Sequence, residues 1–380
     1  MNKQGLHLHE QPPSIPVALN RDCHFYVVLN VDAEWAIPAI KQADPLAGVI
    51  LRMYHPSVME RPIDEWVDLC KAEYDRWQPL CLVPANELNL AREHQELLWG
   101  DNFWDQQAYW ESPAGYYEQR AWWLAFMQHW AGYGPLGVLA LSPGHNEDGP
   151  DNNWSGYEIL RPIVEHPQAT YLILHTYWEQ GRGESLCWGL YEGQDPYWYA
   201  FRPLRPVLWK NHNQPQLAVA PDPGGAMVMF PDKAVLITEA NRLWKRGDDF
   251  DEQAVAEEWA YFYRRYAALP QVKAICWYQE SGNDGEGSET FNVCYNPHLA
   301  YKMRTMEKEI PEGEMSMPEF KFGVLAEAER LRTLGVEVGE PLWDEKWFIA
   351  DMAVQPTTKG AFWVFKHDGN FEVQYHPKKV

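Results

Sequence analysis

The sequence of 380 residues has few basic side chains and no long apolar run. Only 32 lysines and arginines stand against 54 acidic residues, which gives a formal net charge of −22. Such a charge repels phosphate backbones, so we expect no nucleic-acid partner. No stretch of about 18 apolar residues occurs, so we expect no membrane span.

The sequence also lacks two features that would place it in an oxidising compartment. The first residues, Met1 to His7, have no apolar signal core, so either the chain is not exported by that route or a leader has been removed. The six cysteines include no C-x-x-C pair. Cys70, Cys81 and Cys276 lie within apolar patterns, which predicts buried free thiols in preference to disulfides.

Aromatic residues are abundant, with 20 tryptophans and 20 tyrosines. Their flat faces match the C–H faces of sugar rings, and tryptophan and tyrosine add a polar tip. Rings of this kind also fill protein cores. Composition alone leaves sugar stacking and core packing equally open.

Short apolar runs alternate with longer helical patterns, which is typical of βα units and a parallel sheet. Helical spacing of apolar residues predicts helices over 63–77, 116–130 and 255–266. The apolar runs are rich in Val, Ile and Leu, which predicts strands buried on both faces. The eight runs are Gly5–His9, Phe25–Asn30, Gly48–Tyr54, Pro79–Asn86, Gly137–Ser142, Tyr171–Tyr177, Ala234–Glu239 and Lys273–Tyr278.

Eight such units predict an α/β fold, a (β/α)8 TIM barrel over residues 1–310. An open doubly wound sheet is the competing architecture, and it is less favoured because no Gly-rich phosphate loop follows the first strand. Residues 316–380 are predicted to form a small C-terminal α+β module, with a helix ending near Gly335 and a β-hairpin turning at 367–370. This segment loosely resembles C-terminal modules appended to bacterial hydrolases.

Two aromatic-rich insertions, 100–115 and 178–231, are longer than a barrel needs. We interpret both as walls of a substrate cleft. An extended cleft would suit endo-action on a β-linked polysaccharide, and a pocket would suit exo-action.

Each predicted strand ends in polar or ionisable residues, and Glu87 and Glu239 end the fourth and seventh strands. In such barrels the catalytic groups gather at the C-terminal ends of the strands. Hydrolysis of a glycosidic bond requires two carboxyl groups, one to protonate the leaving oxygen and one to attack the anomeric carbon or activate water. These two glutamates are therefore the candidate catalytic pair.

The sequence around both glutamates resembles clan A glycoside hydrolases. Residues 85–89, Ala-Asn-Glu-Leu-Asn, are similar to the Asn-Glu-Pro-Asn signature of that clan, with Leu88 in place of the usual Pro. Residues 237–240, Ile-Thr-Glu-Ala, are similar to its nucleophile motif. The resemblance covers roughly residues 5–300.

The resemblance implies a retaining glycoside hydrolase that acts on a β-linked oligo- or polysaccharide without a cofactor or metal. Glu239 would be the nucleophile, and Glu87 would be the acid/base, with its pKa raised by the neighbouring carboxylate. Asn86 would bind the sugar 2-hydroxyl, Tyr177 would hold Glu239, and Trp277 would lie beneath the sugar. The other predicted substrate-binding residues are Arg52, which could also lower the pKa of the nucleophile, His175 and Trp178.

Two other functions are compatible with the sequence. His7 and His9 resemble the metal ligands of amidohydrolase barrels, which would make the protein a zinc-dependent hydrolase. A non-catalytic barrel that binds glycan within a phage or cell-surface assembly is the second alternative. A retaining glycoside hydrolase should hold its two carboxyl groups about 5–5.5 Å apart, and this separation distinguishes it from the two alternatives.

Overall fold

The computed structural model describes most of the barrel and the strands of a separate sheet. The described residues are 3–8, 23–55, 57–94, 103–142, 155–180, 187–188, 190, 200–204, 225–243, 252–278, 297–309, 346–349, 352–357, 360–367 and 370–377.

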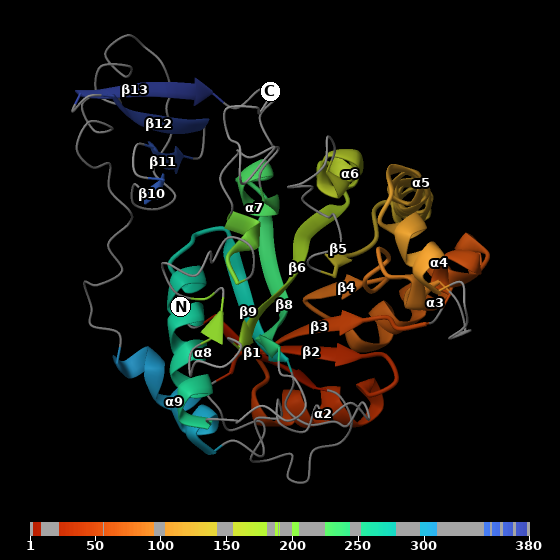
Figure 1. Cartoon of the computed structure of the whole chain (residues 1–380). Coiled ribbons are helices and arrows are strands. Elements are labelled where there is room, and N and C mark those ends of the chain that lie inside the picture. Colours follow the sequence, from red (N-terminus) through yellow and green to blue (C-terminus); the bar gives the residue numbers. More distant parts are fainter. Residues whose placement is uncertain are drawn as a thin grey trace.

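Eight parallel strands form a closed barrel (Figure 1). β1 pairs with both β2 and β9, and β5 pairs with both β4 and β6, so the sheet has no free edge in this ring. The prediction of a (β/α)8 TIM barrel is confirmed. The strands are β1 Gln4–Leu8, β2 Phe25–Leu29, β3 Gly48–Arg52, β4 Cys81–Val83, β5 Leu136–Leu141, β6 Ala169–Gln180, β8 Ala234–Leu243 and β9 Val272–Tyr278. A two-residue strand, β7 Cys187–Trp188, adds antiparallel to β6.

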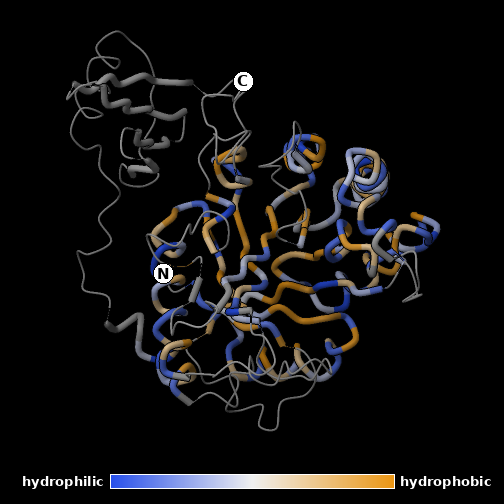
Figure 2. The backbone as a smooth tube through the Cα atoms, in the orientation of Figure 1, coloured by the Kyte–Doolittle hydropathy of each residue, from blue (hydrophilic) through white to orange (hydrophobic). Residues whose placement is uncertain are grey.

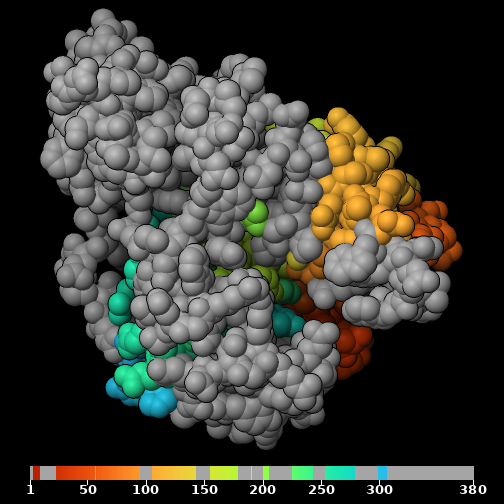
Figure 3. Space-filling view, viewed as in Figure 1, coloured from red at the N-terminus to blue at the C-terminus, as the bar shows by residue number. Residues whose placement is uncertain are grey.

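Helices follow the strands and cover the outside of the barrel (Figure 1). The three helices predicted from apolar spacing correspond to α3, α5 and α8. The helices are α2 Ala33–Ala43, α3 Ile63–Trp77, α4 Phe103–Trp110, α5 Pro113–Trp130, α6 Gly156–Val164, α7 Ala226–Met229, α8 Glu252–Ala267 and α9 Pro297–Glu309. Three short 3-10 helices join them: η1 Val58–Glu60, η2 Ala91–Glu93 and η3 Arg202–Leu204. In the space-filling view α5, in gold, forms part of one exposed flank (Figure 3).

Strand residues alternate between the barrel interior and the layer beneath the helices, because successive side chains point to opposite faces. The interior cluster is small and includes Ile50, Ile173 and Leu236. The outer cluster is larger and contains most of the buried aromatic rings, among them Trp66 and Trp130. Figure 2 shows apolar residues along the strands. Many tryptophans therefore serve core packing.

The buried thiols predicted from the sequence are confirmed. Cys70, Cys81 and Cys276 are free and fully buried, and Cys23 is also free and buried. Burial raises the pKa of the Cys70 thiol well above its ordinary value, with a smaller contribution from the Glu73 charge. These thiols stay protonated and act as small apolar groups.

A second sheet has four consecutive antiparallel strands. Its last two strands form a hairpin in which His367 lies opposite Asn370, as expected from the turn signal. The predicted helix of this module and most of the aromatic segment 178–231 lie outside the described residues. Within the described part of the chain, no helix has the length and apolar character needed to cross a membrane. The strands are β10 Lys346–Ile349, β11 Met352–Thr357, β12 Gly360–His367 and β13 Asn370–Pro377.

Candidate active site

Glu87 lies on the loop that follows β4 and is 4% exposed. Its backbone adopts a φ of 30°, in the left-handed region that residues with a side chain rarely occupy. Such strained positions persist only where the surrounding structure holds them, and they cluster at functional sites. Asn89 anchors the loop to the end of β5, because its side-chain amide donates to the Ser142 carbonyl at 2.8 Å and accepts from the Ser142 amide at 2.9 Å.

Glu239 lies on β8 and is directed into the barrel by a β-bulge. Ile237 pairs with Leu174 of β6, whereas Glu239 pairs with His175, so β8 has one extra residue at this point. Strict alternation from the interior residue Leu236 would have pointed Glu239 outward. The bulge changes the phase of the strand and turns the carboxylate toward the axis of the barrel.

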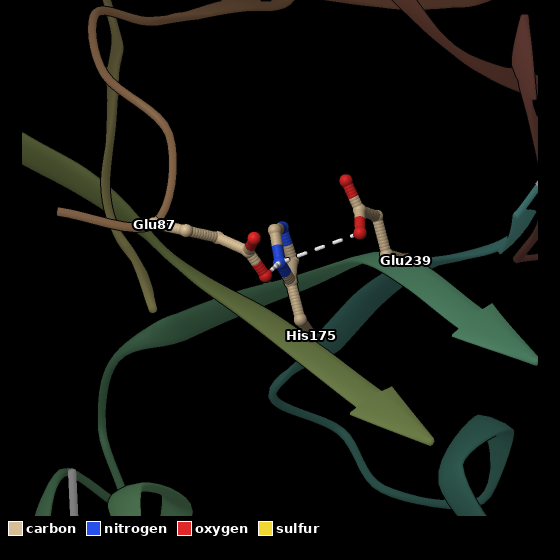
Figure 4. Close-up of side chains that lie close together, drawn as sticks. All are labelled: Glu87, His175 and Glu239. Carbon is tan, nitrogen blue, oxygen red and sulfur yellow. Dashed lines mark hydrogen bonds and ion pairs between the residues drawn. The ribbon is translucent and has the colours of Figure 1, made fainter. Parts of the chain in front are cut away.

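His175 lies between the two glutamates (Figure 4). Its Nδ1 atom is 2.9 Å from Glu87 Oε1 and 3.5 Å from Glu239 Oε2. One carboxylate oxygen from each glutamate and one nitrogen of His175 lie within 4.8 Å of one another. All three side chains are buried. Two carboxyl groups that are far apart in the sequence are therefore adjacent in the folded barrel.

Arg52 and Tyr177 hold the Glu239 carboxylate from two sides. Arg52 Nη1 donates a hydrogen bond to Glu239 Oε1, and the Tyr177 hydroxyl donates to Oε2. Arg52 Nη1 also donates to Asn86 Oδ1 at 3.0 Å. The carboxylate is thus fixed in orientation, and Asn86 is linked to it through the guanidinium group.

The surroundings keep Glu239 ionised. Burial by itself would raise its pKa, but the charges of His175, Arg52 and His7, together with the Tyr177 hydrogen bond, hold the pKa well below the ordinary value. Burial, the Glu239 charge and the Glu87 charge raise the pKa of Tyr177 well above 10, so its hydroxyl remains a donor. Burial opposes the charge of Arg52, yet Glu239 raises its pKa above the usual range.

Six of the predicted site residues are brought together in this cluster: Glu87, Glu239, Asn86, Arg52, His175 and Tyr177. Tyr278 was missed by the sequence reasoning. Alternation from the interior residues Ala274 and Cys276 directs it inward, and its ring centroid lies 4.8 Å from that of His7. The two-residue alternation along β9 is present in the sequence and would have predicted that Tyr278 points into the barrel.

Trp178 and Trp277 do not join the cluster, which corrects the expectation that they contact substrate. Both are buried in the outer layer against α8, where Trp178 stacks on Phe262 at 4.9 Å and Trp277 meets Trp259 edge-on at 5.3 Å. Trp178 Nε1 donates to Glu258 Oε2 at 2.8 Å. The physical reason is the two-residue period of the strand. Since the residue before each tryptophan points into the barrel, the tryptophan itself must point outward.

The histidines of the amidohydrolase alternative are not gathered in the described part of the structure. His7 is buried in the barrel, and His9 lies outside the described residues. Among the residues that the structure describes, Glu87, His175 and Glu239 are the group with the spacing of metal ligands, and His7 is not a member. This group fits a cation poorly, because Arg52 places a positive charge on Glu239 and both oxygens of that carboxylate already accept hydrogen bonds.

No protein-family model and no curated protein matches this chain. Solved structures with a similar backbone include a glucosidase from Croceicoccus marinus, with a TM-score of 0.50 and 10% identity over 95% of this chain and 74% of that chain. A GH128 subgroup II endo-β-1,3-glucanase from Pseudomonas viridiflava has a TM-score of 0.45 and 11% identity over 80% and 97% of the two chains. A family 5 xyloglucanase from Paenibacillus pabuli has a TM-score of 0.42 and 12% identity over 80% and 98%. At this identity the likeness to the glucosidase shows a shared fold.

Proposed function

We infer that this protein is a retaining glycoside hydrolase that cleaves a β-linked oligo- or polysaccharide. The observation that carries this proposal is the pair of buried carboxylates, Glu87 and Glu239, with oxygens within 4.8 Å. Retaining enzymes hold their carboxyl groups about 5–5.5 Å apart, whereas inverting enzymes leave about 6.5–9.5 Å for a water molecule. The proximity of these oxygens is closer to the retaining arrangement than to the inverting one, and it favours direct attack on the sugar.

The unequal surroundings of the two glutamates assign their roles. A nucleophile must be ionised and oriented, and Glu239 has a lowered pKa and accepts hydrogen bonds from Arg52 and Tyr177. Glu87 is therefore the general acid, which protonates the leaving oxygen while Glu239 attacks the anomeric carbon. The C–O bond breaks as the glycosyl ester forms, and Glu87 then removes a proton from the water that hydrolyses this ester.

Asn86 and Tyr278 are the residues we assign to substrate contact beside the carboxylates. Asn86 Oδ1 accepts from Arg52, so its Nδ2 group faces Glu93 and retains a second hydrogen for a sugar hydroxyl. Tyr278 occupies the interior position at the end of β9, where we expected Trp277 from the sequence. The protein from Croceicoccus marinus that shares this fold is a glucosidase, which is consistent with a glycoside hydrolase.

The experiment that tests the proposal measures hydrolysis across a panel of aryl β-glycosides and β-linked polysaccharides. Wild type is compared with Glu87→Gln, Glu239→Gln and the double variant, and Glu34→Gln on an exposed helix position serves as the matched control. We expect the activity of each single variant to fall at least about a thousandfold. The double variant should be little less active than either single variant, because the effects of substituting residues that act as a unit are not additive. Proton NMR of the first product formed should show retained anomeric configuration.

Three outcomes would reject parts of this proposal. A product with inverted anomeric configuration would show a single-displacement mechanism and reject the double displacement. Full activity in Glu87→Gln and Glu239→Gln would show that neither glutamate is catalytic. Tight binding of a glycan without turnover would favour the non-catalytic glycan-binding barrel.

A further inference from the structure

The loop that carries Glu87 turns back on itself through η2, and two side chains at the end of η2 reach the neighbours of Glu87. Glu93 Oε1 accepts a hydrogen bond from Asn86 Nδ2 at 3.3 Å. His94 Nε2 donates to the Leu88 carbonyl at 2.5 Å. The residue before Glu87 and the residue after it are thus each held by one of two consecutive side chains. Both Glu93 and His94 are buried.

The end of η2 is itself anchored to other elements. The backbone carbonyl of Glu93 accepts from the Ser57 amide at 2.9 Å. Gln107 of α4 accepts from the Ala91 amide at 2.9 Å and donates to the Asn89 carbonyl at 3.1 Å. These contacts make the segment a fixed support for Glu87.

An aromatic stack completes the support. The His94 ring lies flat on Trp110 of α4, with ring centroids 3.4 Å apart and planes 9° apart. Burial lowers the pKa of His94 to about 4, and its bond to Leu88 offsets part of this shift. The ring is therefore neutral near pH 7 and has a single N–H, which the contact with the Leu88 carbonyl assigns to Nε2.

We propose that Glu93 and His94 are positioning residues that hold Glu87 in its left-handed backbone conformation, with its carboxyl group aimed at His175 and Glu239. A glutamate with a φ of 30° relaxes to a more favourable conformation unless its neighbours are held. The hydrogen bonds to Asn86 and Leu88 oppose that relaxation from both sides. This proposal rests on the proposed function, since it is the role of Glu87 as general acid that makes its position matter.

Two substitutions at one position separate the hydrogen bond from the packing. His94→Phe keeps a flat ring on Trp110 and removes the donor, whereas His94→Gln keeps an N–H donor and removes the ring. If the donor holds the loop, Glu87 should move in His94→Phe and stay in place in His94→Gln. At the other side, Glu93→Gln keeps an acceptor for Asn86 and Glu93→Met removes it.

The kinetic readout is the dependence of kcat/KM on the leaving group, measured with phenyl and 2,4-dinitrophenyl β-glucosides or with the aryl glycoside that the panel identifies. Phenol needs a proton from the general acid as it leaves, and dinitrophenol does not. A catalytic group that is misplaced by about 1 Å can lower the rate about a hundredfold. We therefore expect kcat/KM of His94→Phe to fall by about that factor on the phenyl substrate. On the dinitrophenyl substrate kcat/KM should fall by less than about threefold, because kcat/KM reports the first step, in which dinitrophenol leaves without a proton from Glu87. A purely structural role would lower both rates together.

Crystal structures of both His94 variants test the proposal without reference to activity. The expected result is a changed φ at Glu87 in His94→Phe and an unchanged φ in His94→Gln. Equal Glu87 geometry in both variants, or an unchanged ratio of the two rates, would overturn the proposal. If wild type cleaves no glycoside, the proposed function fails, and crystal structures of the His94 variants and of Glu93→Gln and Glu93→Met still decide whether His94 and Glu93 hold the loop.

Discussion

Removal of the Tyr177 hydroxyl tests the electrostatic reasoning about Glu239 most directly. Tyr177→Phe keeps the ring in place and deletes one hydrogen bond to the carboxylate. A hydrogen bond to a charged group contributes about 1.5–3 kcal/mol. At about 1.4 kcal/mol per pKa unit, the pKa of Glu239 should rise by about one to two units in the variant. It should remain below that of an ordinary buried glutamate, because His175 and Arg52 are still present.

The assay is the pH dependence of kcat/KM, which reports ionisations of the free enzyme. Its acid limb should move to higher pH by about one to two units. The control is Tyr133→Phe, which also removes a tyrosine–carboxylate hydrogen bond, but at the protein surface with Asp75. That variant should leave the profile unchanged. An unmoved acid limb in a correctly folded Tyr177→Phe protein would refute the assignment of Glu239 as the ionised nucleophile.

The same variant has a consequence for stability, and the sign follows from the direction of the pKa shift. The folded pKa of Glu239 is lowered, so its ionisation stabilises the fold above the unfolded pKa of about 4.3. That contribution is lost as the pH falls through the folded pKa. Tyr177→Phe should therefore reduce the free energy of unfolding at pH 7 by up to about 1.5–3 kcal/mol. Urea titrations should show this difference persist as the pH is lowered and shrink only once the pH falls below the folded pKa of Glu239 in the variant.

Three further predictions follow from other contacts. Arg52→Met breaks a buried ion pair with Glu239, and it should lower the unfolding free energy by about 3–5 kcal/mol in urea titrations at pH 7; a much smaller loss would mean that the pair is solvated. Trp178→Phe leaves a Glu258 oxygen without its indole donor, so stability should fall by about 1–3 kcal/mol while KM stays constant; a raised KM with normal stability would return Trp178 to the substrate site. Incubation with EDTA should leave the rate unchanged, because Arg52 opposes a cation at Glu239, and a loss that zinc restores would favour the amidohydrolase alternative.

Much of the barrel follows from the sequence alone. Eight apolar runs and three helical patterns appear at the expected positions, because burial on both faces of a parallel strand demands continuous Val, Ile and Leu. The polar residues at strand ends could be assigned to one site for a related reason. In a closed parallel barrel all strand C-termini meet at one mouth, so Glu87, His175 and Glu239 converge without any further information.

The prediction from the sequence placed Trp178 and Trp277 in the site, and it was wrong by one position along each strand. His175 and Tyr177 point into the barrel, so Trp178 must point out, and Tyr278 likewise displaces Trp277. An abundance of aromatic rings near a predicted site suggested sugar stacking. The alternation of the strand decides which of these rings can reach it.

Other features depend on contacts between distant segments and leave no local signal. The bulge in β8 that turns Glu239 inward is a mismatch in pairing with β6 and β9, and pairing is a property of the assembled sheet. The left-handed backbone of Glu87 is maintained by Glu93 of η2, by His94 directly after it, and by Asn89, which binds the end of β5. The sequence by itself determined the strands, their order along the chain and the two glutamates, because these depend on local hydrophobic period and residue type. Only the tertiary structure decided which way each side chain faces at the rim and what holds it there, because those are set by hydrogen bonds that form when remote strands and loops meet.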